Sequence, residues 1–252
     1  MTPETEDLVR SATRWAAVPF VPEVTLLTAA EPFGLWDRTA LDAPPFWAFP
    51  WAGGQGLARY ILDHPETVAG RAVLDVASGS GLVAIAAAKA GARSVLAADI
   101  DDNALTAIAL NAAANAVPAV TPGQVDLAAD AADCAGCADG ADCAGCADGA
   151  DCAGCGDGAG CGDLAGRADP AGCPGGAGVV LAADVFYQRD LATMALRFLR
   201  AARQRGADVL AADPGRAFVP RESLTALATY QVPVLTVLED VPVKEVTVYR
   251  LR

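Results

Sequence analysis

The chain has 252 residues, with 18 Lys plus Arg against 31 Asp plus Glu, one His and eight Cys, and its net charge is −13. Because no basic run offsets this charge, the composition argues against a nucleic-acid partner bound through its phosphates. A single His excludes multi-histidine metal sites and most catalytic triads. No apolar run approaches the roughly 18 residues of a membrane span, and residues 1–7 are acidic where a leader would be basic, so the sequence predicts a cytoplasmic protein without membrane contact.

All eight cysteines and much of the charge lie in residues 130–173. This segment holds nine Asp and one Arg, which is −8 of the total −13 and leaves −5 for the rest of the chain. Leu164 is its one large aliphatic residue, so the segment has too little apolar surface to offset a chain entropy of roughly 1–2 kcal/mol per residue. The sequence therefore predicts a low-complexity insertion that is not part of the core.

Within this insertion, Cys-x-x-Cys pairs recur with a nine-residue period, beginning at Cys134 and Cys137. That spacing suits a tetrahedral metal ion. However, only five residues separate successive pairs, no apolar residue is available to build a metal knuckle, and neighbouring Asp would raise the thiol pKa values. We favour a disordered repeat expansion over soft-metal binding or redox activity, and predict no dedicated metal centre.

The rest of the chain alternates predicted helices and strands. A helix that ends at residue 17 and a short strand at 24–27 come first, followed by a loop at 44–55 with four aromatic residues and three prolines. Further helices are expected at 56–63, 82–90, 103–114, 190–203 and 221–229, and strands at 72–76, 94–98, 120–125, 179–182, 209–212, 234–238 and 243–250.

This alternation predicts an α/β fold with a doubly wound, mostly parallel seven-stranded sheet and an antiparallel C-terminal hairpin. Residues 1–55 are expected to form an N-terminal extension with the aromatic loop. Residues 56–252 are expected to form the main domain, interrupted by the insertion at 130–173.

The strongest local motif is the segment 73–81, where a buried strand ends in a glycine-rich turn before a helix that opens at Leu82. Gly79 and Gly81 allow the backbone to approach a ligand closely, and the helix N-terminus attracts an anion. Asp99 ends the next strand, 18 residues after Gly81, at the position that holds a ribose diol in such folds.

A Gly-x-Gly-x-x-Ala turn alone also fits a dinucleotide, so an NAD-dependent oxidoreductase is one alternative. Asp75 favours another ligand, because its carboxylate inside the strand end would repel a pyrophosphate and attract an amino group. S-adenosyl-L-methionine carries such a group on its amino-acid end, together with a sulfonium. The structural alternative is that Asp75 only caps a helix or a turn.

Two further constellations follow later strands at the same sheet edge. Asp184 and Tyr187 come after the strand at 179–182, where a carboxylate and a phenol would hold an amine nucleophile and stabilise the charge that forms on it. Alternatively, Asp184 caps a helix and Tyr187 is a core aromatic. Asp213 and Arg216 follow the next strand, either as part of a substrate channel or as a turn with an ion-paired Arg.

Five segments, 46–55, 74–82, 98–101, 184–187 and 213–216, together resemble bacterial relatives of the electron-transfer flavoprotein beta-subunit lysine methyltransferase family. The resemblance covers about residues 10–252 apart from the insertion. It implies a Rossmann-like class I methyltransferase fold, S-adenosyl-L-methionine as cofactor, no metal, and methyl transfer to a lysine of a protein such as the flavoprotein subunit or a ribosomal protein. A monomer is expected.

The resemblance also implies roles for individual residues. The cofactor-binding set is Asp75, Gly79, Gly81, Asp99, Trp51, Gly53 and Asp126; the catalytic set is Asp184 and Tyr187; and the substrate-channel set is Trp47, Asp213 and Arg216. A small-molecule N- or O-methyltransferase is the main alternative function, because Trp47, Phe49 and Trp51 would equally line a small pocket. A metal-binding scaffold that acts through the cysteine repeat is a further alternative.

Overall fold

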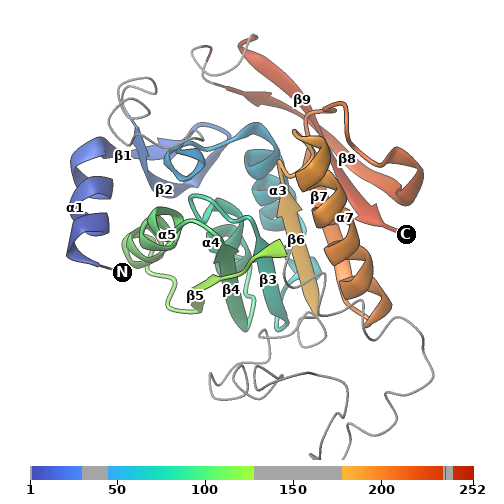
Figure 1. Ribbon diagram of the computed structural model, residues 1–252, viewed down its shortest axis with the longest axis horizontal. Coiled ribbons are helices and arrows are strands. Elements are labelled where there is room, and N and C mark those ends of the chain that lie inside the picture. Colours follow the sequence, from blue (N-terminus) through green and yellow to red (C-terminus); the bar gives the residue numbers. More distant parts are fainter. Residues whose placement is uncertain (1, 30–44, 128–177, 235, 237–240) are drawn as a thin grey trace, which may run out of the picture.

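A seven-stranded mixed sheet forms the centre of the computed structural model, which describes residues 2–29, 45–127, 178–234, 236 and 241–252 (Figure 1). The strand order is β5-β4-β3-β6-β7-β9-β8. Strands β3 to β7 are parallel to one another, and β9 is antiparallel to both β7 and β8. The expected α/β fold is confirmed. The strands are β3 (Ala72–Val76), β4 (Ser94–Asp99), β5 (Val120–Gln124), β6 (Val179–Ala183), β7 (Asp208–Asp213), β8 (Leu224–Pro233) and β9 (Val243–Leu251).

Helices cover both faces of this sheet. Side chains alternate along the strands, so that Val73 and Leu181 face one apolar layer, whereas Leu74 and Val180 face the other. In Figure 1, α7 passes in front of the sheet and α3 lies behind β6. Because the inner parallel strands β3, β6 and β7 are buried on both faces, they appear in the sequence as short apolar runs. One face is covered by α3 (Ala52–Asp63), α4 (Leu82–Lys89) and α5 (Asp102–Ala114), and the other by α7 (Arg189–Gln204).

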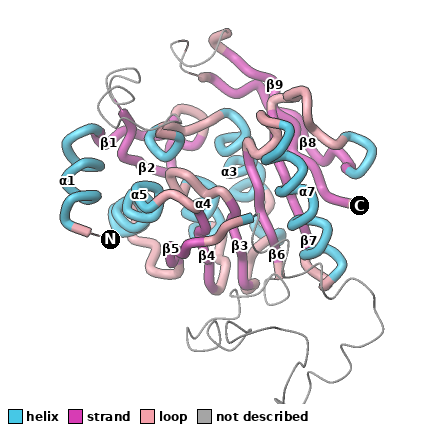
Figure 2. Tube along the Cα trace, viewed as in Figure 1, coloured by secondary structure: helices cyan, strands magenta, loops and turns pink. Residues whose placement is uncertain are grey.

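The N-terminal part differs from the expected helix. Helix α1 (Pro3–Ala12) ends where Thr13 Oγ1 donates a hydrogen bond of 2.6 Å to the Val9 carbonyl. The next six residues form β1 (Thr13–Val18), which pairs antiparallel with β2 (Val21–Ala29) in a separate two-stranded sheet (Figure 2). The expectation of helix up to residue 17 was therefore wrong, because pairing with β2 outweighs the near-helical spacing of the apolar residues.

Helix α3 begins at Ala52, four residues before its expected start, and it runs across residue 55. The preceding aromatic segment contains only a single 3-10 turn, Phe46–Ala48. The start of α3 was not predicted because its first turn contains two glycines, and glycine disfavours a helix by about 1 kcal/mol relative to alanine. A residue outside the helix stabilises this first turn, because Gly54 N donates a hydrogen bond of 2.8 Å to the Asp184 carboxylate.

The helix expected at 221–229 is wrong. A short 3-10 turn at Arg221–Ser223 leads into β8, which pairs along its length with β9. Leu and Ala in this segment favour a helix locally, whereas the open edge of β9 supplies hydrogen-bond partners for a strand. The strand expected at 234–238 falls mostly outside the described residues. An antiparallel C-terminal hairpin is present, but its first strand is β8, which lies earlier in the chain than predicted. Among the described helices, none is long and apolar enough to cross a membrane.

Candidate active site

A cavity of about 250 Å³ opens at the edge of the sheet where β3, β4 and β6 end. Its wall combines the glycine turn after β3, the loop after β6 and the aromatic segment before α3. The carboxyl ends of parallel strands share one edge, and ligands bind there in open α/β sheets. Seven of the predicted site residues line it: Trp51, Asp75, Gly79, Asp99, Asp184, Tyr187 and Arg216.

Asp75 lies at the base of the glycine turn and is 1% exposed. Its Oδ2 accepts hydrogen bonds from Ser78 Oγ at 2.5 Å and from Ala84 N at 3.1 Å. Burial disfavours the charged carboxylate and raises the pKa of Asp75 to about 7, despite these two bonds. Asp75 therefore caps the first turn of α4 and also borders the cavity, so the capping role is compatible with contact to a ligand.

The glycine turn adopts left-handed backbone conformations that admit a ligand at close range. Gly79 and Gly81 have φ of +55° and +81°, and Ala77 has φ of +51°. Asp99, at the end of β4, accepts from Gly79 N at 2.8 Å and from Asp101 N at 3.1 Å. Burial raises the pKa of Asp99 as well. Asp99 thus holds the turn against β4 while it borders the cavity.

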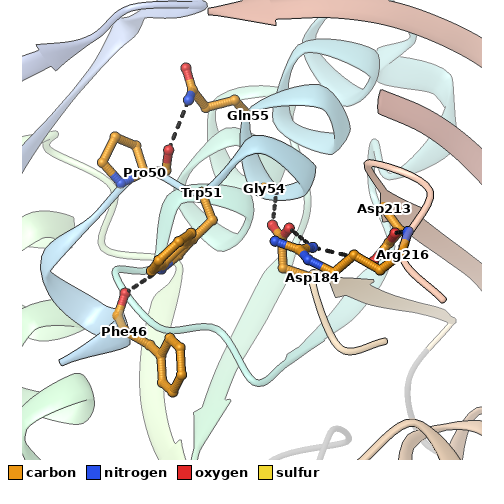
Figure 3. A network of polar contacts seen from close by, with 8 residues as sticks. All are labelled: Phe46, Pro50, Trp51, Gly54, Gln55, Asp184, Asp213 and Arg216. Carbon is orange, nitrogen blue, oxygen red and sulfur yellow. Dashed lines mark hydrogen bonds and ion pairs between the residues drawn. The ribbon is translucent and has the colours of Figure 1, made fainter. Parts of the chain in front are cut away.

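Aromatic rings close one side of the cavity. Phe46 lies 5.8 Å from Trp51 and 5.4 Å from Tyr187, measured between ring centroids. Trp51 Nε1 also donates to the Phe46 carbonyl at 2.9 Å, which fixes the indole (Figure 3). Burial raises the pKa of the Tyr187 phenol, so this group stays protonated at neutral pH.

Asp184 joins three segments in the polar network of Figure 3. Its Oδ2 accepts from Gly54 N at 2.8 Å, and its Oδ1 contacts Arg216 Nη1 at 2.5 Å. Arg216 Nη1 also lies 3.3 Å from Oδ2 of Asp213, which is fully buried. Burial opposes the charged form of Arg216, but the two carboxylates outweigh it and raise the pKa of Arg216; burial raises the pKa of Asp213. The ion pair fixes Asp184 at the cavity.

Gly53 is required by this network although it does not border the cavity. A Cβ atom at Gly53 would lie 2.6 Å from Asp184 Oδ2 and 2.8 Å from the Ala212 carbonyl. Such distances are far below van der Waals contact. Gly53 therefore allows α3 to approach the end of β7 and Asp184, a role different from the predicted contact with the cofactor.

Four other predicted site residues also lie outside the cavity wall. Trp47 is 1% exposed and packs in an apolar cluster with α1, β2 and α5, which argues against its predicted place in a substrate channel. Gly81 packs against Ile108 of α5, and Asp213 acts through Arg216. Asp126 is exposed, two residues beyond β5.

Sequence reasoning missed several residues of the site. Ser78 follows Asp75 by three residues in the turn, so its hydrogen bond to that carboxylate could have been predicted from the local sequence. Gly54 could not be predicted from the local sequence, because its hydrogen-bond partner Asp184 lies 130 residues away in the chain. Leu191 comes from the first turn of α7 and also lines the cavity, as Tyr187 does.

In the part of the chain that the structure describes, no group of three or more His, Cys, Asp or Glu could hold a metal ion. The cysteine repeat lies outside the described residues.

Comparison with known proteins places this site in a family. Residues 60–139 match the family model of ribosomal protein L11 methyltransferase (PrmA). The electron transfer flavoprotein beta subunit lysine methyltransferase of Danio rerio is 31% identical over 223 residues, which cover 84% of this chain and 69% of that protein. The chain belongs to this lysine methyltransferase family.

Other relatives in the lysine methyltransferase family align over a shorter range. The Homo sapiens protein of the same name is 50% identical over 82 residues, or 32% of this chain and 31% of that protein. The chain thus spans about a third of the length of the mammalian relatives that it matches. A solved structure described as a sam-dependent methyltransferase from Streptococcus mutans aligns with a TM-score of 0.54 at 10% identity, over 95% of this chain and 56% of that one. This likeness agrees with the predicted class I methyltransferase fold.

Proposed function

We propose that the chain transfers the methyl group of S-adenosyl-L-methionine to a lysine side chain of a protein, with the electron transfer flavoprotein beta subunit as the first candidate substrate. The observation that carries this proposal is the buried carboxylate of Asp75 below a glycine turn, in a cavity that Asp184 and Tyr187 also line. The family to which the chain belongs supports the same reaction.

The cavity suits a ligand that combines an amino group with a carboxylate. The raised pKa of Asp75 reflects the free-energy cost of a buried charge, and an ammonium group beside it would offset that cost. The N-terminus of α4 next to the turn attracts a carboxylate. S-adenosyl-L-methionine carries both groups on its amino-acid end, and Asp99 is placed to accept hydrogen bonds from its ribose. When bound, this cofactor supplies a methyl group activated by a positively charged sulfur.

Asp184 and Tyr187 are the proposed contacts of the lysine amine. A carboxylate has about four lone-pair positions, so Asp184 retains acceptor capacity beyond the bonds from Gly54 and Arg216. It would accept an N–H of the neutral amine and so orient the nitrogen lone pair toward the methyl group. The rings of Phe46 and Trp51 exclude water from this side.

The alternative NAD-dependent reaction is disfavoured by the same geometry. A pyrophosphate at the glycine turn would lie beside the buried carboxylate of Asp75, which borders the cavity. Repulsion between like charges in a buried site is costly. The cavity would admit a small-molecule acceptor as well as a lysine side chain, so an activity assay has to offer both kinds of substrate.

The test is incubation of the purified chain with radiolabelled S-adenosyl-L-methionine and, separately, the flavoprotein beta subunit, ribosomal protein L11 and a small-molecule extract. We expect label on the flavoprotein subunit, and mass spectrometry of its peptides should locate it on lysine. Label confined to the small-molecule fraction would overturn the protein substrate. A thermal shift with NAD but none with S-adenosylhomocysteine would overturn the cofactor assignment.

Two substitutions separate the roles of the acids. Asp184→Asn should lower the transfer rate at least tenfold while the Kd of S-adenosylhomocysteine, measured by calorimetry, changes little. Asp75→Asn should do the reverse and weaken cofactor binding first, since it removes the charge opposite the amino group. Equal loss of cofactor affinity in both variants would move Asp184 into the cofactor site.

A further inference from the structure

A second concavity lies on the outer surface of α7. Its volume is about 280 Å³, and we call it the arginine groove. Arg189, Arg197, Arg200 and Phe218 line it, together with small and apolar side chains of α7. The segment 189–221 contains seven Arg and only three Asp, although the chain carries a net charge of −13. Positive side chains are thus frequent in this segment of an acidic protein, and three of them line the groove.

Two of the three groove arginines, Arg189 and Arg200, are held by contacts other than ion pairs. Arg189 lies over the Phe218 ring, 5.2 Å from its centroid, and Arg200 Nη2 donates to Ser223 Oγ at 2.7 Å. Among the described residues, neither these two nor Arg197 takes part in an ion pair, whereas Arg59 and Arg71 each do. The groove therefore presents three exposed guanidinium groups that form no ion pair among the described residues.

The arginine groove adjoins the active-site cavity at two points. Leu191 lines the cavity and the next residue, Ala192, lines the groove. Likewise, Arg216 borders the cavity and Phe218, two residues later, borders the groove. A polypeptide that places a lysine side chain in the cavity therefore has the groove within a few residues of its path.

We propose that the arginine groove binds an acidic segment of the protein substrate, one that carries Asp or Glu near the target lysine. This inference rests on the proposed function. Guanidinium groups bind carboxylates through paired N–H donors, and complementary charge accelerates association and selects the partner. An acidic polypeptide fits better than RNA, because the net charge of −13 opposes a long polyanion while the local positive charge suffices for a short acidic segment. Asp190 beside Arg189 and Glu222 beyond Arg200 limit the positive surface at its two ends.

The first test needs no methyl transfer. A fluorescein-labelled hexaglutamate peptide is titrated with the full chain at low salt, and binding is followed by fluorescence anisotropy. We expect the double variant Arg197→Glu/Arg200→Glu to weaken binding at least tenfold, and Arg197→Gln/Arg200→Gln to have an intermediate effect. Both positions are exposed on α7, so the fold should be kept, which circular dichroism checks.

The matched control is Lys89→Glu/Arg93→Glu, which changes the net charge equally at exposed positions at the end of α4 and just after it; α4 packs on the face of the sheet opposite α7. Peptide binding by this control should equal that of the wild type. Equal loss in both double variants, or no binding by the wild type, would overturn the proposal. So would tighter binding of a single-stranded RNA of equal charge that the α7 variant abolishes.

The second test concerns the reaction itself. With the flavoprotein beta subunit as substrate, the α7 double variant should raise KM about tenfold with little change in kcat, because the groove contributes to binding and not to the chemical step. Increasing salt should raise the wild-type KM and leave that of the variant nearly constant. A lower kcat at unchanged KM would overturn a docking role. Peptide binding without any methylation would overturn the proposed substrate but not the binding of acidic segments by the groove. Failure of the proposed function and failure of the groove proposal are therefore distinguishable.

Discussion

Gly53 is the residue at which α3, β7 and Asp184 come closest together. Its surroundings leave no room for a methyl group, since a Cβ would lie 2.6 Å from Asp184 Oδ2. We expect Gly53→Ala to destabilise the fold by about 2 kcal/mol through overpacking, even though Ala is the better helix former. Chemical denaturation measures this change.

Gly54→Ala is the matched control, because a Cβ there would lie 3.7 Å from the nearest side chain, which is ordinary contact. This neighbouring substitution should be neutral or stabilising by up to about 1 kcal/mol. Equal destabilisation by both variants would mean that the loss of helical glycine, and not the contact with Asp184, is responsible.

Asp75 makes stability depend on pH. Its pKa rises from 3.8 to about 7 on burial, so folding takes up a proton between these values and the folded state loses stability as pH rises from about 4 to 7. Asp75→Asn carries no charge and keeps an acceptor for Ser78 and Ala84. The stability of this variant relative to wild type should therefore grow across that window by a few kcal/mol, as measured by urea unfolding at several pH values.

The control for this experiment is Asp7→Asn at an exposed position of α1. Its stability relative to wild type should vary much less between pH 4 and 7. A pH-independent difference for Asp75→Asn would contradict the assignment of a raised pKa to this residue.

Helix α5 connects the N-terminal sheet to the glycine turn through one buried amide. Asn111 Oδ1 accepts from Leu27 N at 2.8 Å, and its Nδ2 donates to the Ser80 carbonyl at 2.8 Å. Asn111→Ala would leave two buried backbone groups unpaired, so we expect a loss of about 3 kcal/mol in the free energy of unfolding. Cofactor affinity should fall as well, because Ser80 belongs to the turn that lines the cavity.

Asn115→Ala, one turn further along α5, tests whether this coupling is specific. Asn115 bonds to Thr25 and to the α5 backbone, and none of these bonds involves the glycine turn. It should reduce stability less and leave the Kd of S-adenosylhomocysteine unchanged. A similar loss of cofactor affinity in both variants would show that docking of the N-terminal sheet as a whole, and not Asn111, controls the turn.

The accuracy with which the local sequence predicted the helices and strands differs from one element to the next. Strands β3 and β6 and helices α4, α5 and α7 were located within one or two residues, because burial on two faces or on one stripe leaves a clear apolar pattern. Strands β1 and β8 were predicted as helix, although each forms an antiparallel pair with the strand that follows it in the chain. Local propensity is weak compared with the hydrogen bonds that such pairing provides.

At the scale of the whole molecule, the insertion predicted at residues 130–173 lies outside the described residues, in the segment between β5 and β6. All seven strands of the central sheet, and every described residue that lines the cavity, lie outside this segment. We expect a variant in which a short Gly-Ser linker replaces 130–173 to keep its fold, its Kd for S-adenosylhomocysteine and its methyl transfer. Circular dichroism, calorimetry and the labelling assay measure these three properties. Loss of function with an intact fold would favour the metal-binding scaffold instead.

The sequence by itself determined the α/β class, the glycine turn with Asp75 and Asp99, and the acids that follow β6 and β7, because each depends on a short run of neighbouring residues. Only the tertiary structure decided that Asp184 binds both Gly54 and Arg216, that Gly53 is needed for this approach, and that Trp47 lies in the core. These contacts join segments far apart in the chain. Their existence depends on how the helices and strands pack, which no local pattern of residues records.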